Sequence, residues 1–130
     1  MVFIIAEIGT NHMGNLEIAK QIIDVAKDAG CDAVKFQKKN INKIYTKEFL
    51  DSTIDSPWGT TQHEMRLHRE FSIKQFEEIN KYCKKKKMTW FTSCWDTQSQ
   101  ISMRKFKTKY NKVASAMLTH NKLLELIAKE

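Results

Sequence analysis

Four short apolar segments are spaced along this chain between stretches that have helical periodicity. The segments span residues 3–7, 33–37, 89–92 and 111–114, and each has the length and the aliphatic or aromatic content typical of a buried strand. The stretches between them place apolar residues three and four positions apart, which indicates amphipathic helices. This alternation of strand and helix predicts a parallel sheet covered by helices.

The helical stretches also carry start and stop signals. The first helix is expected over residues 15–29, capped by Asn15 and ended by Gly30. Its apolar face consists of Leu16, Ala19, Ile22, Ile23 and Ala26. Ser72 and Gln75 form the capping box of a second helix, for which we expect a buried stripe of Ile73, Phe76, Ile79, Tyr82 and Cys83. Thr97 and Gln100 are expected to cap a third helix in the same way, with Ile101 and Phe106 facing inward, and Thr119 is expected to cap a last helix.

A long stretch at residues 38–71 follows the second expected strand. It holds the only proline, in Ser56-Pro57-Trp58-Gly59, and only Glu64 to Arg69 has a partly helical pattern. Loops of this length within compact domains are usually functional or disordered. We interpret this one as an irregular but ordered insertion that could act as a lid.

Each expected strand leads into polar, chemically useful residues. Glu7 ends the first strand, Lys35 and Gln37 the second, Ser93 follows the third, and Lys112 and Ser115 flank the fourth. In a parallel α/β barrel the active site lies at these carboxyl ends of the strands. Lysines and hydroxyls together suit a small substrate that carries phosphate or carboxylate.

The length of 130 residues allows one domain but not a whole barrel of roughly 250 residues. We therefore expect an α/β fold of the (β/α)8 TIM-barrel type, with about the first four β/α units present. The final stretch, 123–130, has no helix stop signal, and we expect a truncated piece of a longer protein.

Composition narrows the setting of the protein. No stretch approaches the roughly 20 apolar residues of a membrane span, and no signal peptide is recognisable. Three cysteines, an odd number without a CxxC pair, argue against a disulfide framework and favour the cytoplasm. The net charge of +7 would be compatible with nucleic-acid binding, but the lysine run at 84–87 complements the end of a helix, so we do not favour that function.

Four ordered motifs resemble those of the N-acetylneuraminate (sialic acid) synthase family. The motifs read IAEIGTNHMGN at 5–15, DAVKFQ at 32–37, FTSCWD at 91–96 and KVAS at 112–115. The resemblance covers the whole chain but only the first half of the family's catalytic barrel. Ala116 and Met117 depart from the family pattern, which leaves the acceptor sugar open.

The resemblance implies a transferase that condenses phosphoenolpyruvate with an N-acylated amino sugar, usually N-acetylmannosamine. The products are a nine-carbon acidic sugar and phosphate. The family uses a divalent metal, Mn²⁺ or Mg²⁺, whose ligands we expect outside this chain. The full-length protein is expected to be a homodimer, and the 130 residues alone are expected to be inactive.

The resemblance also implies a role for each strand-end residue. The catalytic set is Glu7, Lys35 and Lys112. The set that binds phosphoenolpyruvate is Lys35, Ser93, Lys112 and Ser115. The set that binds the acceptor sugar is Gln37, Asn11 and His12. Phosphoenolpyruvate carries close to three negative charges, so two lysines and two hydroxyls suit it, each charge-assisted hydrogen bond contributing roughly 1.5–3 kcal/mol.

Two other functions stay open at this point. One is a different sugar-phosphate barrel enzyme, such as an isomerase or a related keto-acid phosphate synthase. The other is a basic half-barrel that binds or assembles without catalysis, because exposed sheet edges favour self-association.

Overall fold

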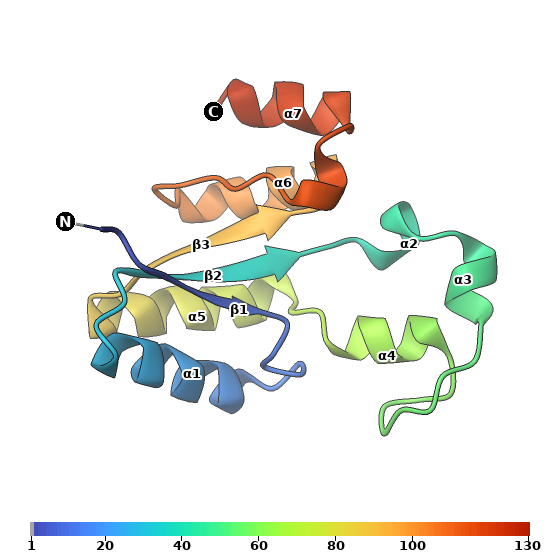
Figure 1. Cartoon of the computed structure of the whole chain (residues 1–130), viewed down its shortest axis with the longest axis horizontal. Coiled ribbons are helices and arrows are strands. Elements are labelled where there is room, and N and C mark those ends of the chain that lie inside the picture. Colours follow the sequence, from blue (N-terminus) through green and yellow to red (C-terminus); the bar gives the residue numbers. More distant parts are fainter. Residues whose placement is uncertain (1) are drawn as a thin grey trace.

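The computed structural model describes residues 2–130 and contains a three-stranded parallel sheet. The strands are β1 (Ile5–Gly9), β2 (Ala33–Lys38) and β3 (Thr89–Cys94), and they lie in that order. Helix α1 (Leu16–Asp28) joins β1 to β2, and α5 (Ile73–Lys86) precedes β3 (Figure 1). The fold is therefore an α/β fold of parallel β/α units, as the sequence predicts.

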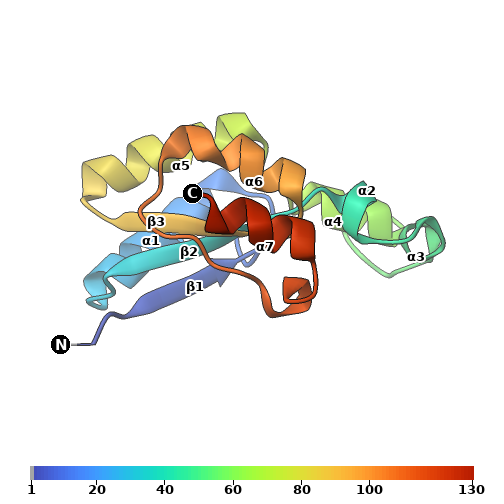
Figure 2. The ribbon, with the colours of Figure 1, turned by 90° about the horizontal axis from the view of Figure 1, so that it is seen from above.

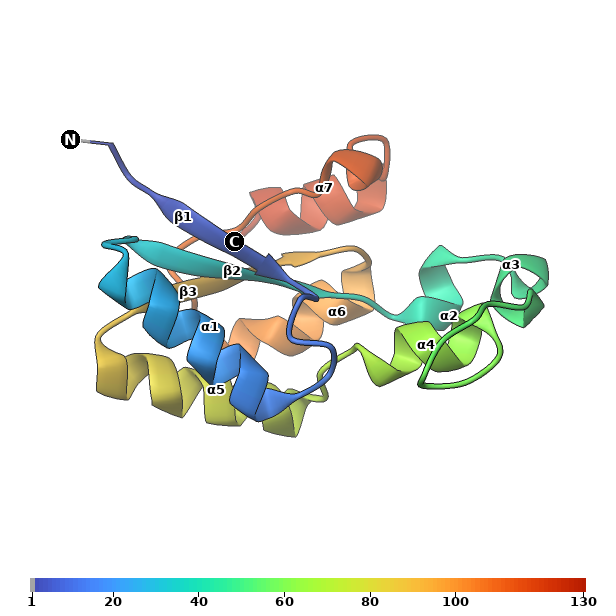
Figure 3. The same cartoon turned by 60° about the horizontal axis from the view of Figure 1, so that its bottom comes forward.

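Helices α1 and α5 lie side by side against one face of the sheet, as Figures 1 and 3 show. Their apolar faces meet the residues of the sheet that point the same way, among them Val34, Phe36 and Trp90. The predicted faces of both helices are confirmed, with Ala19, Ile23, Ala26, Phe76, Ile79 and Cys83 buried. Each large apolar side chain buried in this core contributes roughly 1.5–3 kcal/mol.

The predicted caps of these two helices are confirmed as well. The Asn15 side chain accepts hydrogen bonds from the amides of Glu17 and Ile18 at 2.8 and 3.1 Å. Ser72 and Gln75 form a reciprocal capping box at the start of α5. Gly30 follows the end of α1 at a φ of +80°, a conformation that favours glycine.

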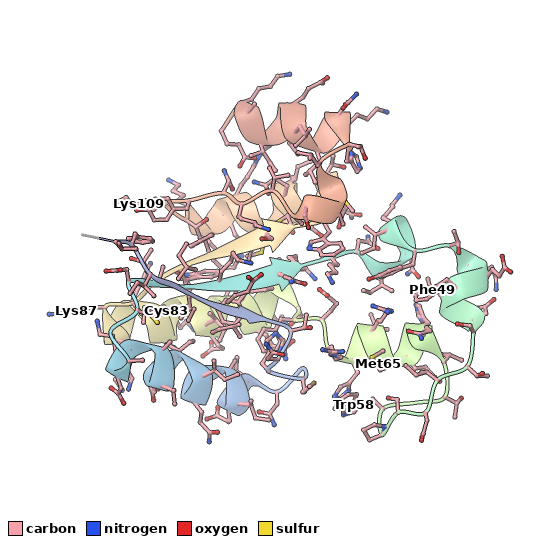
Figure 4. All side chains as sticks on the ribbon, in the orientation of Figure 1. Phe49, Trp58, Met65, Cys83, Lys87 and Lys109 are labelled. Carbon is pink, nitrogen blue, oxygen red and sulfur yellow. The ribbon has the colours of Figure 1, made fainter. Side chains whose placement is uncertain are left out.

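The stretch at 38–71 holds more helix than the sequence predicts, since its pattern indicates helix only at Glu64–Arg69. It contains α2 (Ile41–Ile44), α3 (Lys47–Asp51) and α4 (Gln62–His68). These helices are too short to show a clear apolar period, but local caps hold them, such as the Thr61–Glu64 capping box of α4. They form a lobe beyond the carboxyl ends of β1 and β2 (Figures 1 and 2), with Phe49 and Met65 facing the space between its helices (Figure 4).

The expected fourth strand at 111–114 is wrong. Within residues 2–130 the structure shows no strand there, and of these four residues only Val113 has a β-branched side chain. The preceding Tyr110 instead packs on the sheet, its ring centroid 5.6 Å from that of Phe91 and 5.5 Å from that of Phe3. The chain then forms a short 3₁₀ turn, η2 (Ser115–Met117), and α7 (Asn121–Ala128).

The start signals of the two last helices also differ from expectation. Asp96, not Thr97, caps α6 (Thr97–Met103) by accepting from the Ser99 amide at 2.8 Å. His120, not Thr119, caps α7 through Nδ1, which accepts from the Leu123 amide at 3.3 Å. Ile101 does not face inward but is 53% exposed, because α6 buries the face that carries Ser99, Gln100 and Met103. Phe106 reaches the core from η1 (Arg104–Phe106), a 3₁₀ turn that follows α6.

None of the helices within residues 2–130 is both long enough and apolar enough to cross a membrane.

Candidate functional site at the strand ends

Strand β2 presents apolar side chains to one face of the sheet and polar ones to the other. Val34 and Phe36 belong to the core beneath the sheet, together with α1 and α5. Because side chains alternate along a strand, Lys35 and Gln37 point to the opposite face. Lys35 is only 4% exposed, which is unusual for a lysine and requires a compensating charge.

Glu7 supplies that charge from the neighbouring strand. The register pairs Glu7 with Lys35, and the Lys35 ammonium donates a hydrogen bond to the Glu7 carboxylate. This hydrogen bond and the charge of Lys35 lower the pKa of Glu7, and the charge of Lys112 lowers it further. The structure therefore brings the three predicted catalytic residues into one electrostatic cluster, with a side chain of Glu7 that is 62% exposed to an incoming ligand.

Ser93 adds an unused hydrogen-bonding group to the same face of the sheet. It pairs in register with Gln37 on β2, and its hydroxyl is buried. No group within residues 2–130 bonds to the Ser93 Oγ. Buried polar atoms without a partner are rare in folded proteins and often belong to binding sites. Ser115, by contrast, lies exposed at the start of η2.

The loop after β1 separates the two residues that were expected to contact the acceptor together. Asn11 is exposed, whereas His12 is only 1% exposed and stacks on Phe71 with ring centroids 3.8 Å apart. The His12 Nδ1 accepts a hydrogen bond from the Gly14 amide at 3.1 Å. Burial, helped by the charge of Arg69, lowers the pKa of His12 to about 4. His12 therefore holds the loop from inside as a neutral ring, and its expected contact with the acceptor sugar stays a prediction.

Gln37 lies at the junction between this loop and β2. A β-bulge interrupts the register between Glu7 and Gly9, and Gly9 has a φ of +58°. A Cβ atom at Gly9 would lie 3.5 Å from the Gln37 Nε2, so the amide is packed against the end of β1.

Three cations above this face were not predicted from the sequence. Lys39, Arg66 and Arg69 come together between the end of β2 and α4. A signal for one of them exists in the sequence, because Lys39 continues the every-second-residue pattern of Lys35 and Gln37. The two arginines could not be assigned from sequence, because the partly helical pattern at Glu64–Arg69 does not reveal that this segment lies beside the end of β2.

The described residues do not fit a metal centre. Within residues 2–130 no three His, Cys, Asp or Glu side chains are grouped as a metal site would require. The one strand-end carboxylate, Glu7, is bonded to Lys35. Metal ligands outside this chain stay a prediction.

Parallel β/α units with polar residues at the carboxyl ends of the strands match part of a (β/α)8 barrel. The sequence model of the NeuB family matches residues 22–130, and the chain belongs to the NeuB family. A solved structure described as an N-acetylneuraminic acid (sialic acid) synthetase from Leptospira borgpetersenii, in complex with citrate, superposes with a TM-score of 0.82. It is 29% identical, and the match covers 98% of this chain and 41% of that one.

Comparison with curated proteins finds relatives with the same kind of activity in their names. Human N-acetylneuraminate-9-phosphate synthase is 34% identical over 130 residues, which is 98% of this chain and 36% of the relative. N,N'-diacetyllegionaminic acid synthase from Campylobacter jejuni is 33% identical over 129 residues, 97% of this chain and 39% of the relative. The chain thus spans little more than a third of the length of the relatives it matches.

Proposed function

We propose that this chain supplies the phosphoenolpyruvate-binding part of a synthase that condenses phosphoenolpyruvate with an N-acylated amino sugar. The acceptor would be N-acetylmannosamine or a related sugar, and the product a nine-carbon sialic-acid-like sugar. The observation that carries the proposal is the Glu7–Lys35 pair within the field of Lys112, on the same face as the unpartnered hydroxyl of Ser93.

The lysines would bind the charged groups of phosphoenolpyruvate. Lys35 is held in place by its burial and by Glu7, so little side-chain entropy is lost when it meets an anion. Lys112 adds a second positive charge to the cluster, and Ser93 Oγ is available to donate a hydrogen bond to an oxygen of the ligand. Ser115 would complete the set from η2, and Gln37 and Asn11 would contact the acceptor.

The bond changes follow from the two substrates. The C3 carbon of phosphoenolpyruvate attacks the aldehyde carbon of the open-chain sugar, and a C–C bond forms while positive charge develops at C2. The former aldehyde oxygen takes up a proton and becomes a hydroxyl. Water then adds to C2 and gives up one proton. The bond between C2 and the oxygen that carries phosphorus breaks, and phosphate leaves while the water oxygen loses its second proton and becomes the oxygen of the C2 ketone. Glu7 is ionised because Lys35 lowers its pKa, so its carboxylate can orient the attacking water and accept its proton.

The proposal includes the family's divalent metal only as an ion bound by residues outside this chain. We expect its ligands outside this chain, since residues 2–130 hold no group of three His, Cys, Asp or Glu side chains, and none of the steps above uses the metal. The full-length enzyme would be a homodimer. All three cysteines are unpaired, which suits a reducing compartment such as the cytoplasm.

A ligand panel separates this proposal from another sugar-phosphate barrel. Phosphoenolpyruvate, 3-phosphoglycerate and ribose 5-phosphate are titrated into the isotope-labelled chain while backbone amide resonances are recorded. We expect phosphoenolpyruvate to bind most tightly and to shift the amides of Glu7, Lys35 and Ser93. Tighter binding of ribose 5-phosphate at the same residues would favour an isomerase-type barrel and contradict the proposal.

A further inference from the structure

The end of β3 carries a second buried hydrogen-bond donor that the proposed function does not use. The indole Nε1 of Trp95 is buried and has no hydrogen-bond partner within residues 2–130, and the same holds for Ser93 Oγ two residues earlier. A buried donor without an acceptor costs roughly 1–3 kcal/mol, so such donors are rare and often belong to binding sites. Two of them in one short segment indicate a binding site at the carboxyl end of β3.

The side chains of Ser93 and Trp95 lie on the face of the sheet that holds the candidate site. Cys94, between them, belongs to the core on the helix side, and side chains alternate along a strand. The Trp95 amide donates to the Lys38 carbonyl at 3.0 Å, which continues the pairing of β3 with β2 one residue beyond Cys94. Trp95 therefore extends the line that Ser93 begins, about 6–7 Å further along the strand.

The segment that carries Trp95 is held in place on several sides. Asp96 accepts from the Asn40 amide at 2.7 Å and from the Ser99 amide at 2.8 Å, which ties the residue after Trp95 to the end of β2 and to the start of α6. The Lys39 ammonium lies 3.9 Å from the Trp95 ring centroid, a cation–π contact. Because the half-buried indole is already positioned, a ligand that meets it would lose little affinity to ordering of the side chain.

The chemistry of this place selects its ligand. An indole N–H can only donate, so the ligand must offer a lone pair. The ammonium of Lys39 beside the ring disfavours a cationic ligand, because like charges repel one another most strongly where water is partly excluded. An N-acyl group meets both conditions, since its carbonyl oxygen accepts a hydrogen bond and the group carries no charge. A free amino group, which is protonated at neutral pH, meets neither condition.

The order of residues along the two strands fits the second substrate of the proposed reaction. In the proposed function phosphoenolpyruvate meets Lys35 and Ser93, and Gln37 contacts the acceptor. Gln37 pairs in register with Ser93, and the two strands lie side by side (Figure 1). An acceptor that lies beside Gln37 and extends towards the carboxyl ends of the strands would pass Trp95.

We propose that Trp95 Nε1 donates a hydrogen bond to the carbonyl oxygen of the acceptor's N-acyl group, so that Trp95 selects N-acylated over free amino sugars. The inference rests on the proposed function, which places an amino sugar next to phosphoenolpyruvate on this face of the sheet. Trp95 is then a specificity-determining residue and takes no part in the bond changes.

The test follows the indole N–H resonances of the isotope-labelled chain during titration with N-acetylmannosamine or with mannosamine, with and without phosphoenolpyruvate. The chain has three tryptophans, and the resonance that is absent from Trp95→Phe belongs to Trp95. We expect N-acetylmannosamine to move this resonance and mannosamine to leave it in place. The indole of Trp90, which donates to Asn80 at 3.2 Å, is an internal reference that neither sugar should move.

Trp95→Phe keeps an aromatic ring beside Lys39 but removes the N–H. We expect this variant to bind N-acetylmannosamine roughly three- to tenfold more weakly, as the loss of one neutral hydrogen bond would give. Trp58→Phe is the matched control, because it makes the same substitution at a half-buried tryptophan between α3 and α4 that stacks on His68. It should leave the affinity unchanged.

Three results would overturn the inference. They are an unmoved Trp95 resonance at saturating N-acetylmannosamine or no binding of this sugar, an equal movement with both sugars, and equal affinity of Trp95→Phe and the parent chain. If Trp95→Phe does not fold, the Trp95 resonance is assigned in the parent chain through its neighbours, and the comparison of the two sugars decides.

Failure of the proposed function can be told apart from failure of this inference. If phosphoenolpyruvate does not bind while N-acetylmannosamine alone moves the Trp95 resonance, the proposed function fails and the indole contact stands. If phosphoenolpyruvate binds at Lys35 but neither sugar moves the Trp95 resonance, only this inference fails.

Discussion

At the scale of single residues, burial and charge decide which side chains are available for chemistry. Lys35 is buried yet charged, because Glu7 from the neighbouring strand compensates it. His12 is equally buried, and it stays neutral because burial and the nearby charge of Arg69 lower its pKa. In the sequence Lys35 and His12 look alike, since each is a titratable residue in or just after an expected strand. Only their packing in the structure shows that one is charged and the other neutral.

The neutral His12 makes stability depend on pH. Its pKa is about 4 in the folded chain and about 6.5 when unfolded, so between these values the unfolded chain binds a proton that the folded chain does not. Stability is therefore present above pH 6.5 and is lost as the pH falls towards 4, by up to about 3 kcal/mol. We expect urea-unfolding curves of the chain to show this loss over that range.

His12→Phe is the matched variant, because a phenyl ring can keep the stack on Phe71 but cannot titrate. Its free energy of unfolding should change much less between pH 6.5 and 4 than that of the parent chain. An identical pH slope in both proteins would mean that His12 titrates normally and that carboxylates alone cause the acid sensitivity.

At the scale of elements, the loop after β1 and helix α4 fit together through glycine. Gly14 has a φ of +76°, and a Cβ atom there would lie 2.1 Å from the carbonyl oxygen of His68. Gly30 has a similar φ of +80° but no atom within 4 Å of such a Cβ. The two glycines therefore separate backbone strain from close packing.

Gly14→Ala should destabilise the chain more than Gly30→Ala. The left-handed conformation costs each alanine roughly 1–2 kcal/mol, and Gly14→Ala adds the clash with the backbone of α4. Thermal unfolding of both variants measures the difference. If the two melting temperatures fall equally, α4 does not pack on this loop as the structure describes.

The sequence could predict the elements whose signals are local, and it failed where the signal depends on packing. Asn15 and Ser72 predict the starts of α1 and α5, because their side chains cap the helices through local hydrogen bonds that need no tertiary contact. The prediction of a strand at 111–114 was wrong because a strand forms only where it can pair with a neighbouring strand. Resemblance to a strand motif of the family does not show whether such a neighbour is present. The grouping of Lys39 with Arg66 and Arg69 could not be predicted either, since the arginines approach Lys39 only through the fold of α4.

Among the strand-end residues, too, some positions could be predicted from local pattern and others depend on packing. The alternation along β2 was sufficient to point Lys35 and Gln37 away from the helices, and the register confirms Glu7 opposite Lys35. The inward turn of His12 was not predictable, because the loop motif does not reveal that Phe71 lies behind it.

At the scale of the whole molecule, the chain holds three paired strands of a barrel type that closes with eight. Large apolar side chains are exposed at the start of β1 (Ile5) and in the residues before it (Val2, Phe3 and Ile4). This sheet would contact the substrates of the proposed reaction on one side only.

We therefore expect the 130 residues alone to release no phosphate from phosphoenolpyruvate and N-acetylmannosamine. A phosphate-release assay with added Mn²⁺ or Mg²⁺ measures this. Turnover that depends on both substrates would show that this part of the barrel is sufficient for catalysis, contrary to our expectation.

Binding of phosphoenolpyruvate to Lys35 is the most direct measurement of the central claim. The titration compares the parent chain with Lys35→Met, which keeps the length of the side chain but removes its charge, and with Lys43→Met as an exposed control. We predict that Lys35→Met weakens binding of phosphoenolpyruvate roughly ten- to a hundredfold, while Lys43→Met leaves it unchanged. Equal affinity in all three chains would contradict the assignment of the strand ends as the phosphoenolpyruvate site.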